Sequence, residues 1–378
     1  MSAALDSATE YQGRARVALS AALAAGPSHA YLFRGPRGSG KRAAARALAA
    51  EILAGASADP DDARRRALLD PSPHPDLVWI APRGAQHLVE EVREQVIRAA
   101  SYRPFEGGKR VFVVEAAEAM RDESQNALLK TLEEPPEFAH LILLSSEPEA
   151  LLETVTSRCQ PIEFAPLPAA VVEAELTATG ADPAAVAAAA RLAAGDVERG
   201  RLLLSESGRG LRGEAERAVA AALGGDVASS PWRTLLAGAE EAGEEAEAAA
   251  REALEAEAEV GVKRSARDQA DEAKRAGRRR RTEILDLGLE LCAAWLRDLA
   301  AVAAGAEEVV FNADRLAELR EQAAGLDPAA ARRGAELVAQ TRRSLDLNVS
   351  EELALEALFF RLERTVSDAA MRRPQSSK

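Results

Sequence analysis

Cysteine, lysine and aromatic side chains are scarce in this chain. Its two cysteines, Cys159 and Cys292, exclude a disulfide framework and suit a reducing compartment. The four histidines are scattered, so we expect neither zinc nor another metal held by protein ligands. Aromatic residues make up 4% of the 378 residues, whereas alanine occurs about 85 times, and this balance favours close-packed helices.

Long apolar runs are missing as well. The run Leu141–Leu144 is too short to span a membrane, and Arg191 interrupts the alanine-rich stretch from 184 to 194. The first ten residues have neither a basic start nor a long apolar region, so we expect no signal peptide. The sequence therefore predicts a soluble, cytoplasmic protein that has no membrane partner.

Positive charge is in the minority. The chain has 61 acidic and 48 basic residues, which gives a formal net charge of −13. A protein with this balance is not expected to hold nucleic acid by its overall electrostatic field. Its hydrophobic content of 47% is nevertheless high enough for packed cores, and its length predicts two or three domains.

Strand-like and helix-like segments alternate up to about residue 165. Short apolar runs of strand length are Ala30–Phe33, Leu77–Ile80, Val111–Val114 and Leu141–Leu144. Because helical segments lie between these runs, we predict a parallel sheet covered on both faces. The prolines of Ala165–Pro168 then interrupt the pattern, and the rest is helical in character. We divide the chain into an α/β domain at 1–165, a small helical domain at 166–206 and a longer helical domain at 207–378.

A glycine-rich loop lies between the first predicted strand and an alanine-rich helix. Its candidate nucleotide-binding residues are Gly35, Gly38, Ser39, Gly40, Lys41 and Arg42. The spacing is that of a P-loop, in which backbone N–H groups and a helix N-terminus hold phosphates and Lys41 reaches the outer ones. Arg42 stands where Ser or Thr would place a hydroxyl on Mg²⁺, so the loop is degenerate. The alternative is a glycine turn before a helix, with Lys41 as an ordinary surface lysine.

The third predicted strand leads into an acid, Glu115, and so resembles a degenerate Walker B element. A competent element ends in Asp-Glu, which holds Mg²⁺ and polarises the attacking water. Here the first acid is one methylene longer and Ala116 replaces the second. Together with Arg42, these changes predict that ATP binding is weak or absent and that Mg²⁺ is bound only if ATP is. The alternative, that Glu115 is only a solvated acid at a strand end, stays open.

Two further motifs make the pattern specific. The run Asn126–Pro136 reads NALLKTLEEPP, and Ser157-Arg158-Cys159 follows one strand and one short helix later. With the P-loop, these motifs closely resemble bacterial DNA polymerase III clamp-loader subunits of the AAA+ type. The resemblance implies a RecA-like AAA+ domain, then an all-α lid domain and an all-α collar domain that joins a ring of subunits.

Within this family, the degraded ATPase motifs favour the delta-prime type. The ATP-hydrolysing motor type, gamma/tau-like, is the alternative. The residues from 52 to 76 contain no cysteine for the zinc module that family members often carry, and Glu198, beside Arg199, stands where motor subunits place the sensor-2 arginine. The resemblance implies a subunit of the DNA polymerase III holoenzyme without ATPase activity of its own. Its partners would be motor and delta subunits in a hetero-oligomer, and through the complex the sliding clamp and primed DNA in replication.

Arg158 is the one catalytic residue that the resemblance implies. Such an arginine is presented across a subunit interface, in trans, to the γ-phosphate of ATP bound by the neighbouring motor subunit. A permanently charged, planar guanidinium is suited to stabilising charge on transferring phosphoryl oxygens. The alternative is a structural arginine that pairs with a nearby acid such as Glu163. The adjacent Cys159 is expected to be packed rather than reactive.

Acidic and basic residues segregate between residues 240 and 281. Glu240–Glu259 carries a net charge of −8, whereas Val262–Arg281 carries +6. One interpretation is a solvated helix or helical hairpin whose opposite charges attract. The other is that Arg278–Arg281 contacts nucleic acid or a partner protein.

Overall fold

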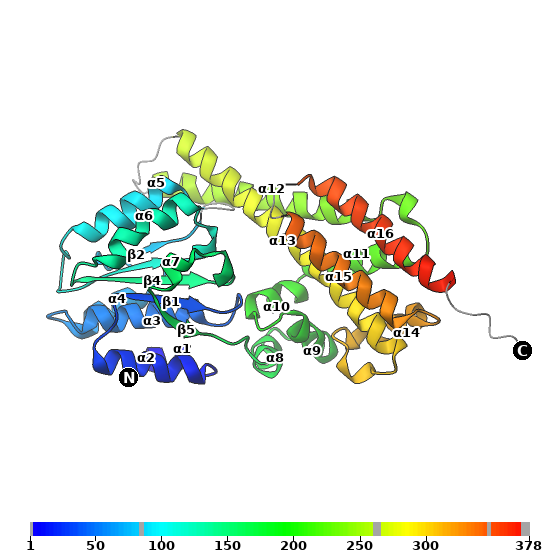
Figure 1. Ribbon diagram of the computed structural model, residues 1–378, viewed down its shortest axis with the longest axis horizontal. Helices are drawn as coiled ribbons and strands as arrows, with labels where there is room; N and C mark the ends of the chain where they lie inside the picture. The colour runs from blue at the N-terminus through cyan, green and yellow to red at the C-terminus, as the bar shows by residue number, and fades with distance from the viewer. Residues whose placement is uncertain (1–2, 83–86, 260–265, 346–348, 372–378) are drawn as a thin grey trace, which may run out of the picture. The chain divides into compact units, whose positions relative to one another are not determined.

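The computed structural model describes residues 3–82, 87–259, 266–345 and 349–371. The chain forms two compact units, Met1–Pro168 and Ala169–Lys378. This division falls at the end of the segment Ala165–Pro168, which has no regular secondary structure. Figure 1 shows the chain coloured from blue in the first unit to red at the end of the second.

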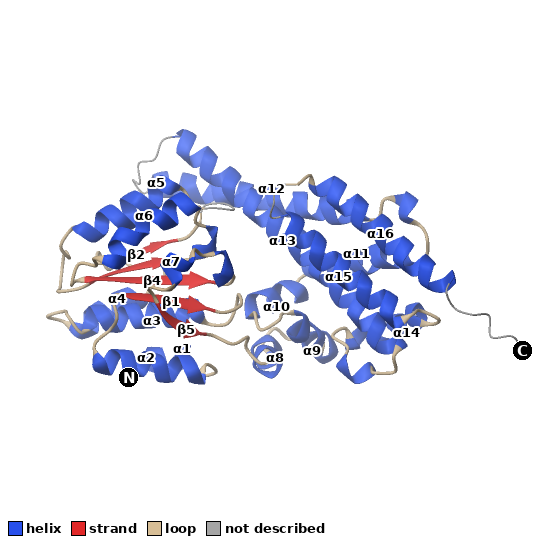
Figure 2. Cartoon of the chain, in the orientation of Figure 1, coloured by secondary structure: helices blue, strands red, loops and turns tan. Residues whose placement is uncertain are grey.

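The first unit contains a five-stranded parallel sheet. Its strands are β1 (Ala30–Arg34), β2 (Leu77–Ile80), β3 (Arg110–Val114), β4 (Ala139–Ser145) and β5 (Gln160–Glu163). They lie in the order β2-β3-β4-β1-β5, and each neighbouring pair is parallel (Figure 2). In the centre of the sheet, Leu32 of β1 lies opposite Leu143 of β4 and Pro161 of β5. The predicted fold class, an α/β domain with a parallel sheet followed by helical parts, is confirmed.

Helices cover both faces of this sheet, as Figure 1 shows. They are α1 (Ala3–Ala8), α2 (Gly13–Ala25), α3 (Lys41–Ala54), α4 (Pro60–Leu68), α5 (Val89–Val92), α6 (Asp122–Glu133) and α7 (Glu153–Thr156), and a π-helical turn (Arg93–Arg98) continues α5. Tyr31 and Phe33 belong to the core shared with α1–α4, and Leu32 belongs to the core shared with α5–α7. Both strand faces are therefore buried, as their continuous apolarity predicts.

The described residues of the second unit form helices joined by turns and loops, without a strand. Its helices are α8 (Ala169–Thr177), α9 (Pro183–Leu192), α10 (Val197–Leu204), α11 (Glu206–Leu223), α12 (Trp232–Glu259), α13 (Ala266–Ala303), α14 (Leu316–Ala323), α15 (Pro328–Leu345) and α16 (Glu351–Met371). Arg191 of α9 donates to the Val310 carbonyl oxygen at 2.7 Å, so the small helical module is bonded to the rest of this unit. A separate lid and collar with a boundary near 206 stays a prediction.

Helices α12 and α13 form a long antiparallel hairpin. They approach closely at two glycines, because a Cβ added to Gly277 would lie 2.8 Å from the Gly243 carbonyl oxygen. The helical-hairpin interpretation of the charged segment is thus confirmed for residues 240–259 and 266–281. Residues 260–265 lie outside the described part of the chain.

Candidate functional site

The glycine-rich loop joins β1 to α3 in the predicted strand–loop–helix arrangement. Gly38 and Gly40 have φ angles of +73° and +85°, which L side chains rarely adopt. Gly35 lies so close to Phe164 that an added Cβ would be 2.2 Å from its carbonyl oxygen. A fully buried Ser39 completes the turn before α3 begins at Lys41. These conformations and the close approach explain why glycine occupies positions 35, 38 and 40 of the loop.

Gln12 fixes this loop to the end of the sheet. Its Nε2 donates to the carbonyl oxygens of Ser39 at 2.8 Å and of Ala165 at 2.7 Å, and its Oε1 accepts from the Ala165 N–H at 2.9 Å. The side chain is buried, so these bonds satisfy it away from water. The sequence gives no signal for this role, because Gln12 lies outside the loop motif.

Lys41 donates hydrogen bonds within the loop and to Ser146, the residue that follows β4. Its Nζ donates to the carbonyl oxygens of Gly35 at 2.8 Å and Pro36 at 2.9 Å, and to Ser146 Oγ at 3.0 Å. The ammonium group thus bonds the loop's own carbonyls. A phosphate would have to exchange for these acceptors in order to bind Lys41.

Arg42 forms an ion pair with Glu115. Its Nε lies 2.6 Å from Glu115 Oε1, and an Nη nitrogen lies 3.1 Å from an oxygen of Asp70. The other Glu115 oxygen accepts from the indole N–H of Trp79 at 3.1 Å. The guanidinium of Arg46 stacks on the same indole, 4.4 Å from the ring centroid, and pairs with Asp70 at 2.8 Å. The structure therefore brings the degenerate P-loop and the degenerate Walker B acid together.

These residues do not fit a magnesium site. Mg²⁺ takes oxygen ligands in near-octahedral geometry, whereas the two Glu115 oxygens face a guanidinium and an indole N–H. A divalent cation beside Arg42 would also be repelled by the fixed positive charge. Elsewhere in the described ranges, no cluster of His, Cys, Asp or Glu side chains could hold a metal ion.

Arg158 follows α7 and lies at the surface. Its Nη2 is 2.7 Å from Glu133 Oε1, at the end of α6, and its Nη1 donates to the Thr154 carbonyl oxygen at 2.9 Å. The alternative, a structural arginine paired with a nearby acid, is met by Glu133 and not by Glu163, which pairs with Arg34 across neighbouring strands. The contacts of Arg158 thus connect the two motifs, NALLKTLEEPP and Ser-Arg-Cys, that the sequence singles out. In the described residues, Arg158 has no bond to the Arg42–Glu115 pair.

In the sensor-2 region, both Glu198 and Arg199 are engaged in ion pairs. Arg199 of α10 pairs with Glu290 of α13, and Glu198 pairs with Arg201 of its own helix. Arg342 of α15 joins the same network, 2.7 Å from Glu290. The positive charge of Arg199 is therefore compensated within the second unit.

Both cysteines are buried, and burial raises the pKa of each thiol to about 12, as expected for packed rather than reactive side chains.

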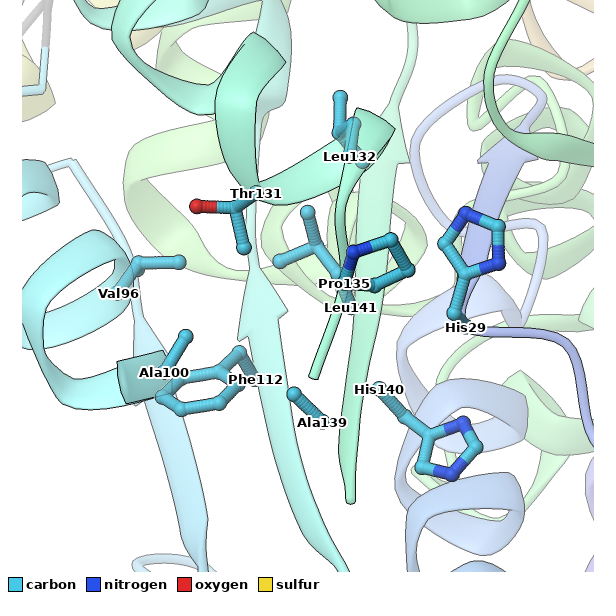
Figure 3. Close-up of a pocket in the computed structure, with 10 residues that line it drawn as sticks. All are labelled: His29, Val96, Ala100, Phe112, Thr131, Leu132, Pro135, Ala139, His140 and Leu141. Atoms are coloured by element: carbon cyan, nitrogen blue, oxygen red, sulfur yellow. The ribbon is translucent and has the colours of Figure 1, made fainter. Parts of the chain in front are cut away.

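A cavity of about 10 Å³ lies at the amino ends of β1 and β4 (Figure 3), lined by residues that include His29, Phe112 and Pro135. It has room for roughly one water molecule. No helix within the described ranges is long and apolar enough to cross a membrane.

Comparison with known proteins matches residues 13–168 to the family model for "DNA polymerase III, delta subunit". The chain is 38% identical over 156 residues to DNA polymerase III subunit delta′ of Pseudomonas aeruginosa, covering 39% of this chain and 46% of the relative. It is 33% identical over 159 residues to the delta′ subunit of Bacillus subtilis, covering 41% and 48%. With DNA polymerase III subunit gamma/tau of Mycobacterium bovis it is 39% identical over 163 residues, covering 42% and 28%.

These matches span about half the length of the delta′ relatives, or less in the gamma/tau protein. The family model covers the strand, loop and helix motifs described above. It ends at Pro168, which is also the last residue of the first compact unit. Residues 13–168 are therefore similar to the family described as DNA polymerase III, delta subunit, and to delta′ and gamma/tau subunits of DNA polymerase III.

Proposed function

We propose that this chain acts as a delta-prime subunit of the DNA polymerase III clamp loader. It hydrolyses little or no ATP itself and presents Arg158 in trans to ATP held by a neighbouring motor subunit. Motor and delta subunits, the sliding clamp and primed DNA are its partners through the complex. The similarity of residues 13–168 to delta′ subunits supports the general role. The geometry of Arg42 and Arg158 supports the proposal that this chain hydrolyses little ATP and acts on ATP held by a neighbour.

The Arg42–Glu115 ion pair is the observation that carries this proposal. In an active site of this kind, a divalent cation connects the P-loop hydroxyl, the Walker B acid and the phosphates. Here a guanidinium nitrogen lies 2.6 Å from the acid, and Ala116 supplies no second carboxylate to polarise water. The gamma/tau-like alternative needs Mg²⁺ at the position that Arg42 takes.

The surroundings of Arg158 are consistent with a finger used in trans. Its side chain is 36% exposed and its partner Glu133 is 49% exposed, so solvent screens this pair. Exposed pairs of this kind contribute only about 0 to 1 kcal/mol, which a phosphate with several charged oxygens can readily exceed. Arg158 is therefore held in one orientation and still able to exchange Glu133 for a phosphate.

The test is assembly followed by turnover. We expect the full-length chain to co-purify with gamma/tau and delta subunits, because the proposed role exists only in that complex. Alone, the chain should show no steady-state ATP hydrolysis above a Lys41→Ala control. Failure to co-purify would contradict the clamp-loader role, and turnover by the isolated chain that Lys41→Ala abolishes would favour a motor subunit.

A further inference from the structure

The helical hairpin carries a segregated charge that the proposed function does not explain. We call α12 residues 240–259 and α13 residues 266–281 the arm. At its base, Arg281 pairs with Glu240 of α12 and with Glu351 of α16, and Gly243 packs against Gly277. Arg281 is therefore committed to holding the arm and is not available to a ligand.

Three cations on α13 behave differently from Arg281. The side chains of Lys274, Arg275 and Arg278 have no ion pair and no hydrogen bond with any residue that the structure describes. Lys274 and Arg278 are exposed, and Arg275 is half-buried. The attraction between oppositely charged helices that the sequence predicts is thus seen at Arg281, which pairs with Glu240 of α12. The charges of Lys274, Arg275 and Arg278 are not compensated by a direct contact with a described residue.

The three cations lie on one face of α13. At 3.6 residues per turn, Lys274 and Arg278 are one turn apart, roughly 6 Å along the axis, and Arg275 lies within about 100° of both. Asp271, one turn earlier and half-buried, is the nearest acid on this arc. We call Lys274, Arg275 and Arg278 the basic face.

The composition of the arm indicates which kind of partner suits this face. Protein interfaces have apolar cores rich in aromatic side chains. Of the exposed large hydrophobic residues that the structure describes, none lies on α12 or α13. A surface of cations without an apolar anchor matches a phosphate backbone, to which Arg and Lys bind without reading the sequence.

We propose that the basic face contacts the phosphate backbone of double-stranded DNA, independently of base sequence. This inference does not depend on the roles of Arg42 or Arg158. It moves the candidate contact from Arg278–Arg281 to Lys274, Arg275 and Arg278, because Arg281 is engaged at the base of the arm. The net charge of −13 and the acids of α12 keep the affinity low and make it strongly dependent on salt.

The experiment measures binding of the full-length chain to a labelled duplex by fluorescence anisotropy over a range of salt concentrations. In the variant Lys274→Gln/Arg275→Gln/Arg278→Gln, each lost phosphate contact should lower the slope of log K against log salt by about 0.9. The full variant should therefore lose about 2.7 in slope and bind at least tenfold more weakly at low salt.

The matched control removes three other exposed arginines of the same unit that have no ion pair among the described residues. It is Arg217→Gln/Arg332→Gln/Arg361→Gln, on α11, α15 and α16, and should leave the slope and affinity close to wild type. Equal losses in both variants, unchanged binding in the basic-face variant, or no binding by the wild type at low salt would overturn the inference. So would unchanged DNA binding with lost binding to polyglutamate, which would assign the face to an acidic protein surface.

Discussion

At the scale of single residues, the fate of the candidate ATP site depends on where Arg42 places its charge. A Ser or Thr here would leave Glu115 free for a cation, but the guanidinium takes one carboxylate oxygen and Trp79 takes the other. The carboxylate oxygens that would bind the metal ion in a motor subunit are thus both engaged, one by Arg42 and the other by Trp79. The pair needs no ion from solvent to balance the acid.

Arg42→Ala should destabilise the protein modestly. Arg42 is 55% exposed and Glu115 is 23% exposed, so we expect a loss of about 0.5 to 1 kcal/mol in the free energy of unfolding. Denaturant unfolding measures this change. The matched control is Arg37→Ala in the same loop, which is exposed and should change stability by less than about 0.5 kcal/mol.

A double-mutant cycle isolates the pair itself. Glu115→Ala should cost as much again or more, since it also removes the acceptor of the Trp79 N–H. If the two residues act as a pair, Arg42→Ala should have a smaller effect in the Glu115→Ala background. Strictly additive losses would show that Arg42 stabilises the loop by another route.

The sequence predicts residue types better than it predicts partners. The unusual residues Arg42, Glu115 and Ala116 are recognised from their positions in the motifs. The contact between Arg42 and Glu115 cannot be predicted in this way, because it depends on how β3 and α3 meet in space. The same limit applies to Arg158, whose expected alternative partner Glu163 is bonded to Arg34 while Glu133 takes its place.

At the scale of secondary structure, glycine positions decide how closely helices can pack. Gly208 lies within the first turns of α11, where an added Cβ would be 1.8 Å from the Leu202 carbonyl oxygen. In the arm, Gly277 gives the close approach to Gly243. These glycines are required by packing, although glycine in a helix interior costs about 1 kcal/mol relative to alanine.

Two glycine-to-alanine changes should therefore have opposite signs. Gly277→Ala places a Cβ 2.8 Å from a backbone carbonyl and should destabilise the second unit by about 1 to 3 kcal/mol. Gly210→Ala, within α11 and with open space around it, should stabilise by about 0.5 to 1 kcal/mol. Thermal unfolding of both variants measures the difference. Equal shifts in the same direction would contradict the close crossing of α12 and α13.

Buried strands are predicted from the sequence because both of their faces are apolar. Strand β5 cannot be predicted in this way, because only Ile162 of its four residues is buried and Pro161 interrupts its apolar pattern. A strand at the edge of a sheet needs neither continuous apolarity nor every backbone N–H. Its position becomes visible only when the pairing with β1 is known.

At the scale of the whole molecule, chemistry and helix content are divided between the two units. The glycine-rich loop, Glu115 and Arg158 all belong to the unit that the family model covers. The second unit is built from helices, with Arg199 and Arg342 both paired to Glu290. Under the proposed function, the first unit would contact phosphate and the second unit would serve assembly.

The most direct test of the central claim is the clamp- and DNA-stimulated ATPase rate of the complex reconstituted with gamma/tau and delta subunits. This chain enters the complex as wild type, Lys41→Ala or Arg158→Ala. We predict that Lys41→Ala leaves turnover unchanged, whereas Arg158→Ala lowers it, because the site that Arg158 faces loses on the order of 10³-fold or more in rate. Loss of turnover with Lys41→Ala and normal turnover with Arg158→Ala would contradict the account.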